Sequence, residues 1–330
     1  MIGEYVLVVC AAAPGKTILL GEHFVVYGEP AIAMAIDLEA KVVAHQRDDM
    51  SIHIASNLGT GTFDGEVFKA SSEEDDLRRT LEPIKISTEA VLRHFNLRRG
   101  VELHVESEIP ASVGLGSSAA TSVATVAAVS RLLGFELTSS DILSMSLDAE
   151  KYVHGSPSGI DQQVSTLGGI LLYRRSGEPM RLKCPVELPL VIGNTCERRS
   201  TGMLVEAVKQ RRNRLPTVMD HLIKTAGCLV REGADALQSG DLDRLGELMD
   251  INHGLLASVG VSTMALDRLV YAARSAGALG AKLTGAGGGG CIVALCRHGQ
   301  QLKVAEGIKL AGGKPLIVKK RERGVETWLR

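Results

Sequence analysis

A glycine-bearing loop at 110–120, Pro-Ala-Ser-Val-Gly-Leu-Gly-Ser-Ser-Ala-Ala, leads into a run of small residues that extends to Leu133. The run predicts a helix over 118–133, with Gly134 as the residue that ends it. Because nearly all of its side chains are Ala, Val, Ser or Thr, neighbouring elements can pack closely against it, and we expect it to be buried and rigid. The first turn of a helix carries backbone N–H groups without intrahelical partners, which attract anions. The sequence therefore predicts a buried helix whose entrance can hold an anionic group.

The composition agrees with a core built from small side chains. Aromatic residues make up 3% of the 330 residues, whereas glycine occurs 36 times and hydrophobic residues reach 45%. A chain of this length usually exceeds what one core can hold, so we expect two domains, 1–185 and 186–330. The many tight backbone approaches favour mixed α/β layers.

Charge and cysteine usage exclude several classes of protein. The 37 basic and 38 acidic residues nearly cancel, which gives no overall field for binding nucleic acid or an anionic membrane. No window approaches the ~20 apolar residues that cross a bilayer, and the apolar start of the chain indicates a buried strand instead of a signal peptide. The six cysteines lack metal-binding spacing and are typical of reduced thiols. We expect a cytoplasmic protein without nucleic-acid or membrane partners.

Hydrophobic periodicity places the remaining elements along the chain. The polar segment 56–76 is expected to be a surface excursion, with an acidic helix start at 73–76. The arginines at 211, 212 and 214 are expected on a solvated helix face, and 319–323 in a solvent-exposed tail. Strands are predicted at 5–11, 31–44, 51–55, 100–107, 168–173, 190–193, 281–284, 291–295 and 315–319, and helices at 77–95, 138–153, 203–214, 216–239, 241–258, 262–276 and 300–311.

Three glycine-bearing loops, at 13–17, 110–120 and 283–291, are candidates for binding phosphate. The pair Lys16-Thr17 resembles the end of a Walker A loop, but that motif requires glycine where this chain has Cys10. Residues 114–119 match a loose form of the dinucleotide-binding fingerprint, yet no acidic residue marks a second strand about 20 residues later. Neither motif explains the loops, although Gly114 and Gly116 would let the backbone approach a ligand closely.

Three motifs in this order, APGKTILLGEHFVVYG at 13–28, PASVGLGSSAA at 110–120 and KLTGAGGGGC at 282–291, resemble the GHMP kinase superfamily over nearly the whole chain. Within it, residues 21–28 and EKYVHGSPSGIDQQVSTLGG at 150–169 resemble the mevalonate kinase family in its compact archaeal form. The resemblance implies an α+β, two-domain GHMP kinase fold. It consists of an N-terminal domain like ribosomal protein S5, a C-terminal ferredoxin-like α+β sandwich and an active site in the cleft between them.

The resemblance also implies roles for individual residues. Asp161 and Lys16 match the catalytic pair, and Glu150 matches a Mg²⁺ ligand that shares the metal with Ser118 or, alternatively, Ser117. The implied substrates are ATP and mevalonate, with Mg²⁺ as the metal, and a homodimer is expected. The loop and helix start assigned to ATP comprise Pro110, Gly114, Leu115, Gly116, Ser117, Ser118, Ala119 and Ala120. The residues assigned to the alcohol are Glu22, His23, Thr201 and Gly287.

These residue types suit phosphoryl transfer, which requires positioning and charge compensation more than covalent chemistry. A carboxylate can accept the proton of an alcohol as the oxygen becomes more acidic during transfer, and a neighbouring ammonium favours the developing negative charge. Other readings stay open at this point. The chain could phosphorylate another small alcohol, as phosphomevalonate or homoserine kinases do, although the retained Asp161 argues against the homoserine branch. The chain could also bind a nucleotide without catalysing a reaction. For two of the residues assigned to the alcohol, a structural role is the alternative: His23 could be a buried histidine that orients the turns around it, and Gly287 could be part of a turn that connects two strands.

Overall fold

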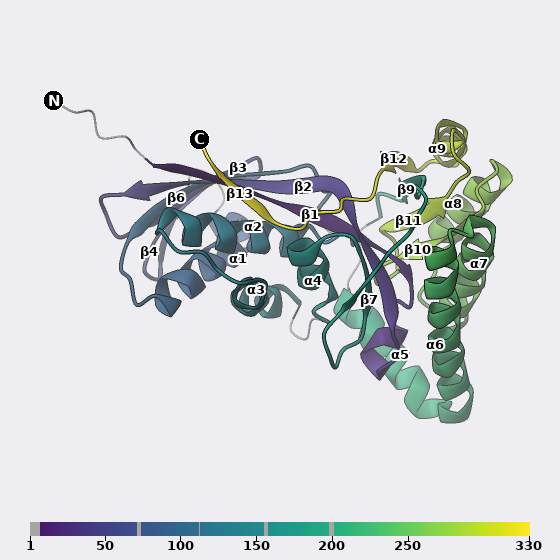
Figure 1. Ribbon diagram of the computed structural model, residues 1–330. Coiled ribbons are helices and arrows are strands. Elements are labelled where there is room, and N and C mark those ends of the chain that lie inside the picture. Colours follow the sequence, from purple (N-terminus) through teal and green to yellow (C-terminus); the bar gives the residue numbers. More distant parts are fainter. Residues whose placement is uncertain (1–6, 71–73, 112, 155–157, 198–200) are drawn as a thin grey trace.

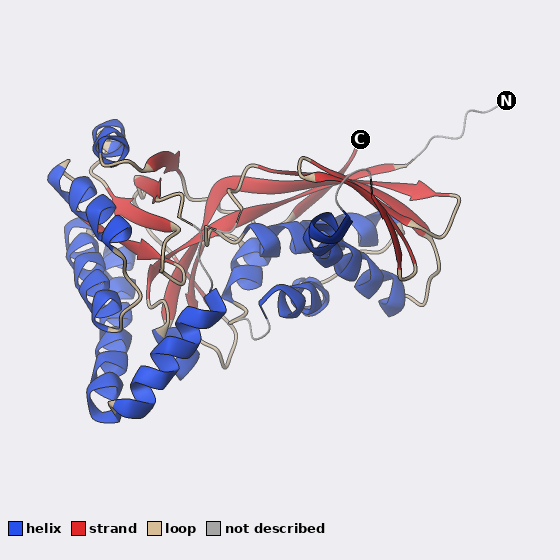
Figure 2. Ribbon diagram, turned by 180° about the vertical axis from the view of Figure 1, so that it is seen from behind, coloured by secondary structure: helices blue, strands red, loops and turns tan. Residues whose placement is uncertain are grey.

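The computed structural model describes residues 7–70, 74–111, 113–154, 158–197 and 201–330 (Figure 1). The molecule is elongated, with two sheets that each carry their own helices (Figures 1 and 2). In the described part of the chain, no helix is long and apolar enough to cross a membrane.

The first sheet has nine strands, and its main path runs in the order β13-β1-β2-β6-β3-β4-β5. Its neighbours are antiparallel except for the parallel pair β3 and β6, and β7 and β8 extend it beside β2. Helices α1 to α4 lie together on one face of this sheet (Figures 1 and 2). The strands are β1 (Val8–Leu20), β2 (Ala31–Arg47), β3 (Ile52–Ser56), β4 (Gly59–Asp64), β5 (Val67–Ala70), β6 (Gly100–Ser107), β7 (Ile170–Tyr173), β8 (Met180–Leu182) and β13 (Glu326–Leu329), and the helices are α1 (Glu74–His94), α2 (Ser117–Leu132), α3 (Ser139–His154) and α4 (Ile160–Leu167).

The second sheet has four antiparallel strands in the order β10-β11-β9-β12. Helices α7, α8 and α9 pack against it, and α6 bridges from α7 to strands β1 and β2 of the first sheet. The strands are β9 (Leu190–Asn194), β10 (Gly280–Thr284), β11 (Cys291–Leu295) and β12 (Lys314–Val318), and the helices are the short η1 (Phe24–Tyr27), α5 (Thr201–Arg214), α6 (Pro216–Ser239), α7 (Leu242–Ser258), α8 (Met264–Ser275) and α9 (Gln301–Leu310).

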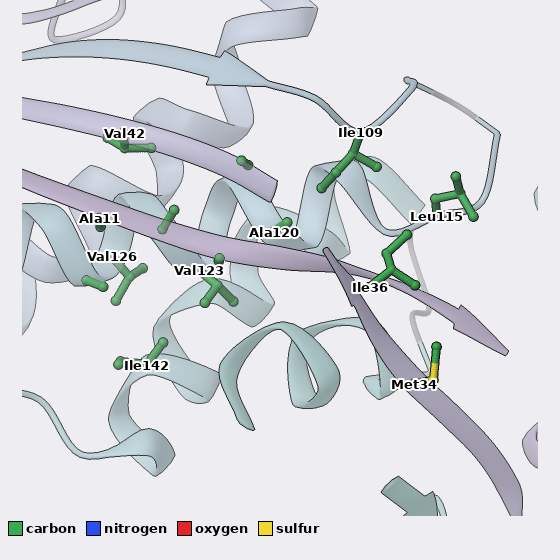
Figure 3. Close-up of a cluster of buried hydrophobic side chains, with 14 of the residues drawn as sticks. Ala11, Met34, Ile36, Val42, Ile109, Leu115, Ala120, Val123, Val126 and Ile142 are labelled. Carbon is green, nitrogen blue, oxygen red and sulfur yellow. The ribbon is translucent and has the colours of Figure 1, made fainter. Parts of the chain in front are cut away.

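Helix α2 occupies the centre of the first half, as its small residues predict. Ala120, Val123 and Val126 lie beneath strands β1 and β2, which contribute Ala11 and Val42 to the same core (Figure 3). All five side chains are fully buried. The predicted stop is confirmed: Gly134 has φ +85°, and the amide of the following residue bonds back into the last turn of the helix.

Two segments predicted as loops are strands. The segment 56–76 contains β4 and β5, because the rings of Phe63 and Phe68 pack in a tilted arrangement with centroids 4.6 Å apart and Gly61 leaves room for the Phe68 ring. Residues 13–17 lie inside β1, where the register against β2 shifts between Pro14 and Lys16. Gly15 is the residue left without a partner at this shift, and Lys16 pairs with Ala35, so the expected loop is a local irregularity within a continuous strand.

The expected solvent-exposed tail and solvated arginine face were also wrong in part. Within 319–323, Arg321 exchanges backbone hydrogen bonds with Ala35 and Gly169, and the chain then continues into β13 beside β1. In α5, Arg211 donates to the carbonyl of Val259 and Arg212 lies over the Tyr27 ring. The two-domain architecture is confirmed, but a boundary at residue 185 stays a prediction, and β13 returns to the first sheet from beyond it.

Candidate active site

Lys16 and Asp161 form an ion pair at the centre of the predicted site. The Lys16 ammonium lies 3.1 Å from Asp161 Oδ1 and donates to the carbonyl oxygen of Gly114 at 3.1 Å. The lysine side chain is 3% exposed, whereas that of Asp161 is 25% exposed. A buried ammonium thus holds a carboxylate that a ligand can still reach.

The backbone before Asp161 is held in place by a tyrosine of β7. Asp161 is the second residue of α4, which begins after Gly159 with φ +82°. Tyr173 of β7 donates its hydroxyl to the carbonyl oxygen of Ser158, and a Cβ on Gly159 would lie 3.2 Å from that hydroxyl oxygen. The aspartate therefore projects from the start of a short helix whose entry is held by a buried tyrosine.

The 113–118 loop lies directly against the strand that carries Lys16. The Lys16 amide donates to Leu115 O at 2.8 Å, and a Cβ on Gly15 would come within 2.8 Å of the same oxygen. On the other side, Gly116 has φ +78° and precedes the first turn of α2. Glycine is required at 15 because two backbones approach each other too closely for a side chain, and it is favoured at 116 because of the positive φ.

The residues expected to hold a metal meet at the same place. Glu150, on α3, is 3% exposed, and burial raises the pKa of its carboxyl to about 7; the negative charge of Asp161 also raises it, while Ser118 and Lys16 act in the opposite direction. The Ser117 hydroxyl instead lies 3.4 Å from that of Ser107. The arrangement therefore brings Glu150 and Ser118 together and ties Ser117 to the end of β6.

The residues expected to bind the alcohol lie where the two sheets meet. His23 has φ +61° and is 7% exposed, and its Nε2 donates to the carbonyl oxygen of Ala286 at 2.8 Å. Ala286 belongs to the glycine-rich loop, in which Gly287 and its neighbours have positive φ. Gly287 could not carry a side chain, because a Cβ would lie 2.1 Å from Val261 O.

Other predicted positions are placed less directly. Glu22 is 1% exposed and forms an ion pair with Lys282, a partner that the sequence did not suggest. Thr201 is the first residue of α5, but its side chain lies outside the described residues. Pro110 is half-buried in the turn after β6, and Ala119 and Ala120 are buried in the first turns of α2.

Lys282 and Tyr173 were missed by sequence reasoning. A lysine between Ala281 and Leu283 in an apolar strand is a signal that could have been used, since a fully buried lysine requires a partner. Tyr173 carried no such signal, because its role depends on which carbonyl lies opposite it.

Comparison with known proteins agrees with this geometry. The family described as GHMP kinases N terminal domain matches residues 83–169, and that described as GHMP kinases C terminal matches 234–313. The chain is 44% identical to a mevalonate kinase of Pyrococcus abyssi, over 96% of this chain and 97% of that protein. The chain belongs to the GHMP kinase family.

Solved structures of mevalonate kinases are also similar to this GHMP kinase. The L. major mevalonate kinase in complex with R-mevalonate superimposes with a TM-score of 0.82 at 28% identity, covering 95% of this chain and 96% of that one. The Methanococcus jannaschii mevalonate kinase gives 0.81 at 26% identity, with 97% and 99% covered. The resemblance seen in the three motifs is confirmed, and the protein is an enzyme of the kinase class.

Proposed function

We propose that this GHMP kinase transfers the γ-phosphoryl group of ATP to the primary hydroxyl of (R)-mevalonate, forming (R)-5-phosphomevalonate and ADP for isoprenoid biosynthesis in the mevalonate pathway. The observation that carries the proposal is the Lys16–Asp161 pair, 3.1 Å apart, at the entrance of α2. The names of its relatives supply the substrate.

Asp161 and Lys16 have different roles at the alcohol. Asp161 is exposed enough to accept the hydroxyl proton as the O–P bond forms, and Lys16 stabilises the negative charge on the alcohol oxygen from its buried side. Because the Lys16 ammonium also bonds to Gly114 O, it is held between the alcohol site and the phosphate loop. Its position requires no rearrangement when the charge develops.

The phosphates of ATP suit the start of α2. The residue before the first turn of this sixteen-residue helix is Gly116, which has no side chain to cap the first-turn amides, and such amides favour negative charge. The phosphates would be contacted by the loop residues Pro110, Gly114, Leu115 and Gly116. The helix start at 117–120 would face the same phosphates.

The donor set fits Mg²⁺. In the described residues, no group of three or more His, Cys, Asp or Glu side chains could hold a metal alone, so phosphate oxygens and water would have to complete the coordination. Glu150 and Ser118 offer hard oxygen donors. Burial, and after it the negative charge of Asp161, raises the pKa of Glu150, and a bound cation would favour the ionised carboxylate against both effects. When bound, Mg²⁺ neutralises phosphate charge during transfer.

The alcohol would lie between η1 and the glycine-rich loop. We assign its recognition to His23, Glu22, Gly287 and Thr201, of which the first three converge where β1 meets β10. We also propose that the enzyme is a cytoplasmic homodimer. Sedimentation of the purified protein would test the oligomeric state.

A panel of alcohols tests the proposal. ADP release should be fastest with (R)-mevalonate, compared with phosphomevalonate, homoserine and galactose. Asp161→Asn should lower kcat by about 10²–10⁴-fold, the usual contribution of general-base catalysis, while ATP binding by calorimetry stays within about twofold. Absence of mevalonate-dependent turnover would remove the substrate, and wild-type rates for Asp161→Asn would remove the aspartate from the mechanism.

A further inference from the structure

A row of buried polar contacts joins the first sheet to the second beside the proposed alcohol site. The Ile18 amide donates to Thr284 Oγ1 at 3.0 Å, and the hydroxyls of Thr17 and Thr284 lie 3.2 Å apart. Further along, the Gly21 amide donates to Asn252 Oδ1 at 2.9 Å. The contacts to Thr284 set the register of β1 against strand β10, and the contact to Asn252 holds the turn before η1 against α7.

The Glu22–Lys282 ion pair is the charged member of this row. Glu22 is 1% and Lys282 0% exposed, and the ammonium also donates to Leu283 O at 2.6 Å and Ile18 O at 3.4 Å. Burial raises the pKa of Glu22 and lowers that of Lys282, and each charge partly offsets the effect of burial on the other. A pair in such surroundings holds both side chains in one orientation.

The two carboxylate oxygens of Glu22 differ in their surroundings, and Oε1 faces Lys282. Within the ranges that the structure describes, Glu22 Oε2 is buried and makes no hydrogen bond. Buried carboxylate oxygens normally accept a hydrogen bond, so such an atom indicates a donor that arrives with a ligand. The neighbouring residue His23 bonds to the glycine-rich loop, which places Glu22 at the same junction.

We propose that Lys282 is a positioning residue for the alcohol substrate: it holds Glu22 so that Oε2 meets a substrate hydroxyl, and together with Thr284 it keeps η1 in register with the glycine-rich loop. Lys282 does not touch the reacting atoms and acts through Glu22. The inference rests on the proposed function, since it concerns the alcohol side of the same site.

The experiment compares Lys282→Met with the double variant Glu22→Gln/Lys282→Met in the full-length protein. The single variant leaves a buried carboxylate without its partner and should lose thermal stability, whereas the double variant removes both charges and should regain most of it. In both, KM for mevalonate should rise at least about tenfold, as expected when a hydrogen bond to a charged group is lost, while the Kd for ATP changes less than about twofold.

A purely structural ion pair would give a different result. In that case the double variant would regain its mevalonate KM together with its stability, which would overturn the proposal, as would an unchanged KM in Lys282→Met. Lys85→Met is the control: Lys85 of α1 is also buried, 3% exposed, and lies 3.4 Å from Glu82 and 3.6 Å from Glu89 of the same helix, which packs on the first sheet and not on the one that carries Lys282. It should lose stability without a change in KM.

A second variant keeps the proposal testable if the Lys282 variants do not fold. Thr284→Val removes the hydroxyl contacts of the same junction without leaving a buried charge, and should also raise KM for mevalonate selectively. An unchanged KM in Thr284→Val would contradict the proposal. Failure of the proposed function would appear differently, as absent turnover of mevalonate by the unmodified protein.

Discussion

At the scale of single residues, His253 shows how the second sheet supports the junction with the first. It is 5% exposed, its Nδ1 accepts from the Leu283 amide at 3.3 Å, and its Nε2 donates to Asp267 Oδ1 at 3.1 Å. This pattern requires the neutral imidazole, because a proton on Nδ1 would displace the Leu283 amide. The strand that carries Lys282 is thus held by a histidine that must stay uncharged.

Acid should therefore destabilise the protein through His253. Burial lowers the pKa of His253 to about 4, with Arg274 and Lys282 acting in the same direction and Asp267 opposing them. Between about pH 6.5 and pH 4 this histidine binds more protons in the unfolded chain than in the folded one, so its contribution to the free energy of unfolding should fall by up to about 3 kcal/mol as the pH is lowered. The raised pKa of Glu150 acts in the opposite direction over part of this window, so the contribution of His253 is measured as a difference from a variant without it. Urea denaturation at several pH values measures this loss.

The histidine variants separate this effect from general acid denaturation. His253→Asn should be less stable at pH 7, but across that window it should lose less stability on acidification than the unmodified protein. His298 is the control, because its side chain is 81% exposed, and His298→Asn should keep the dependence of the unmodified protein. An equal slope in His253→Asn and the unmodified protein would show that His253 does not carry the effect.

At the scale of elements, helix α2 has a glycine with positive φ at each end, and only one of them faces the site. Gly116 has φ +78°, and a Cβ there would lie 3.1 Å from Lys16 Cγ. Gly134 has φ +85°, and a Cβ there would meet no atom within 4 Å. The two positions share the same backbone requirement but differ in what surrounds them.

Gly116→Ala and Gly134→Ala should consequently lose similar stability but different amounts of activity. Each should cost about 1–2 kcal/mol for the left-handed backbone. Only Gly116→Ala should also displace Lys16, and it should lower kcat at least about tenfold, since small misplacements near reacting groups are costly. Thermal denaturation and steady-state kinetics check the pair; equal kcat values in both variants would contradict the role of Gly116.

The same elements show what the sequence could predict. The bounds of α2, α6 and β11 followed within a residue or two from periodicity and from glycines at helix ends, because those signals are local. Lys16, Asp161 and Glu150 were found together only through motifs whose spacing reflects a shared fold. The Glu22–Lys282 pair could not be predicted, because it depends on the register between strands from two different sheets.

At the scale of the whole molecule, the C-terminal segment ties the two halves together. After β12 in the second sheet, the chain crosses to the first sheet, where β13 pairs with the N-terminal part of β1 (Figure 1). Arg321 forms an ion pair with Glu39, and the amide of Gly169 bonds to its carbonyl oxygen. A strand of four residues that follows a charged segment shows no hydrophobic periodicity, which is why the sequence suggested a solvent-exposed tail.

Gly168 tests the importance of this crossing. It has φ +70°, and a Cβ there would lie 2.3 Å from the carbonyl carbon of Arg323, so Gly168→Ala must push the crossing segment away from the end of α4. Gly177 also has positive φ, +118°, but a Cβ there would meet no atom within 4 Å. Gly168→Ala should destabilise the protein by about 1–3 kcal/mol more than Gly177→Ala, the usual cost of overpacking, and should accelerate proteolysis near the C-terminus. If chemical denaturation gave both variants the same stability, the crossing would not hold the two halves together.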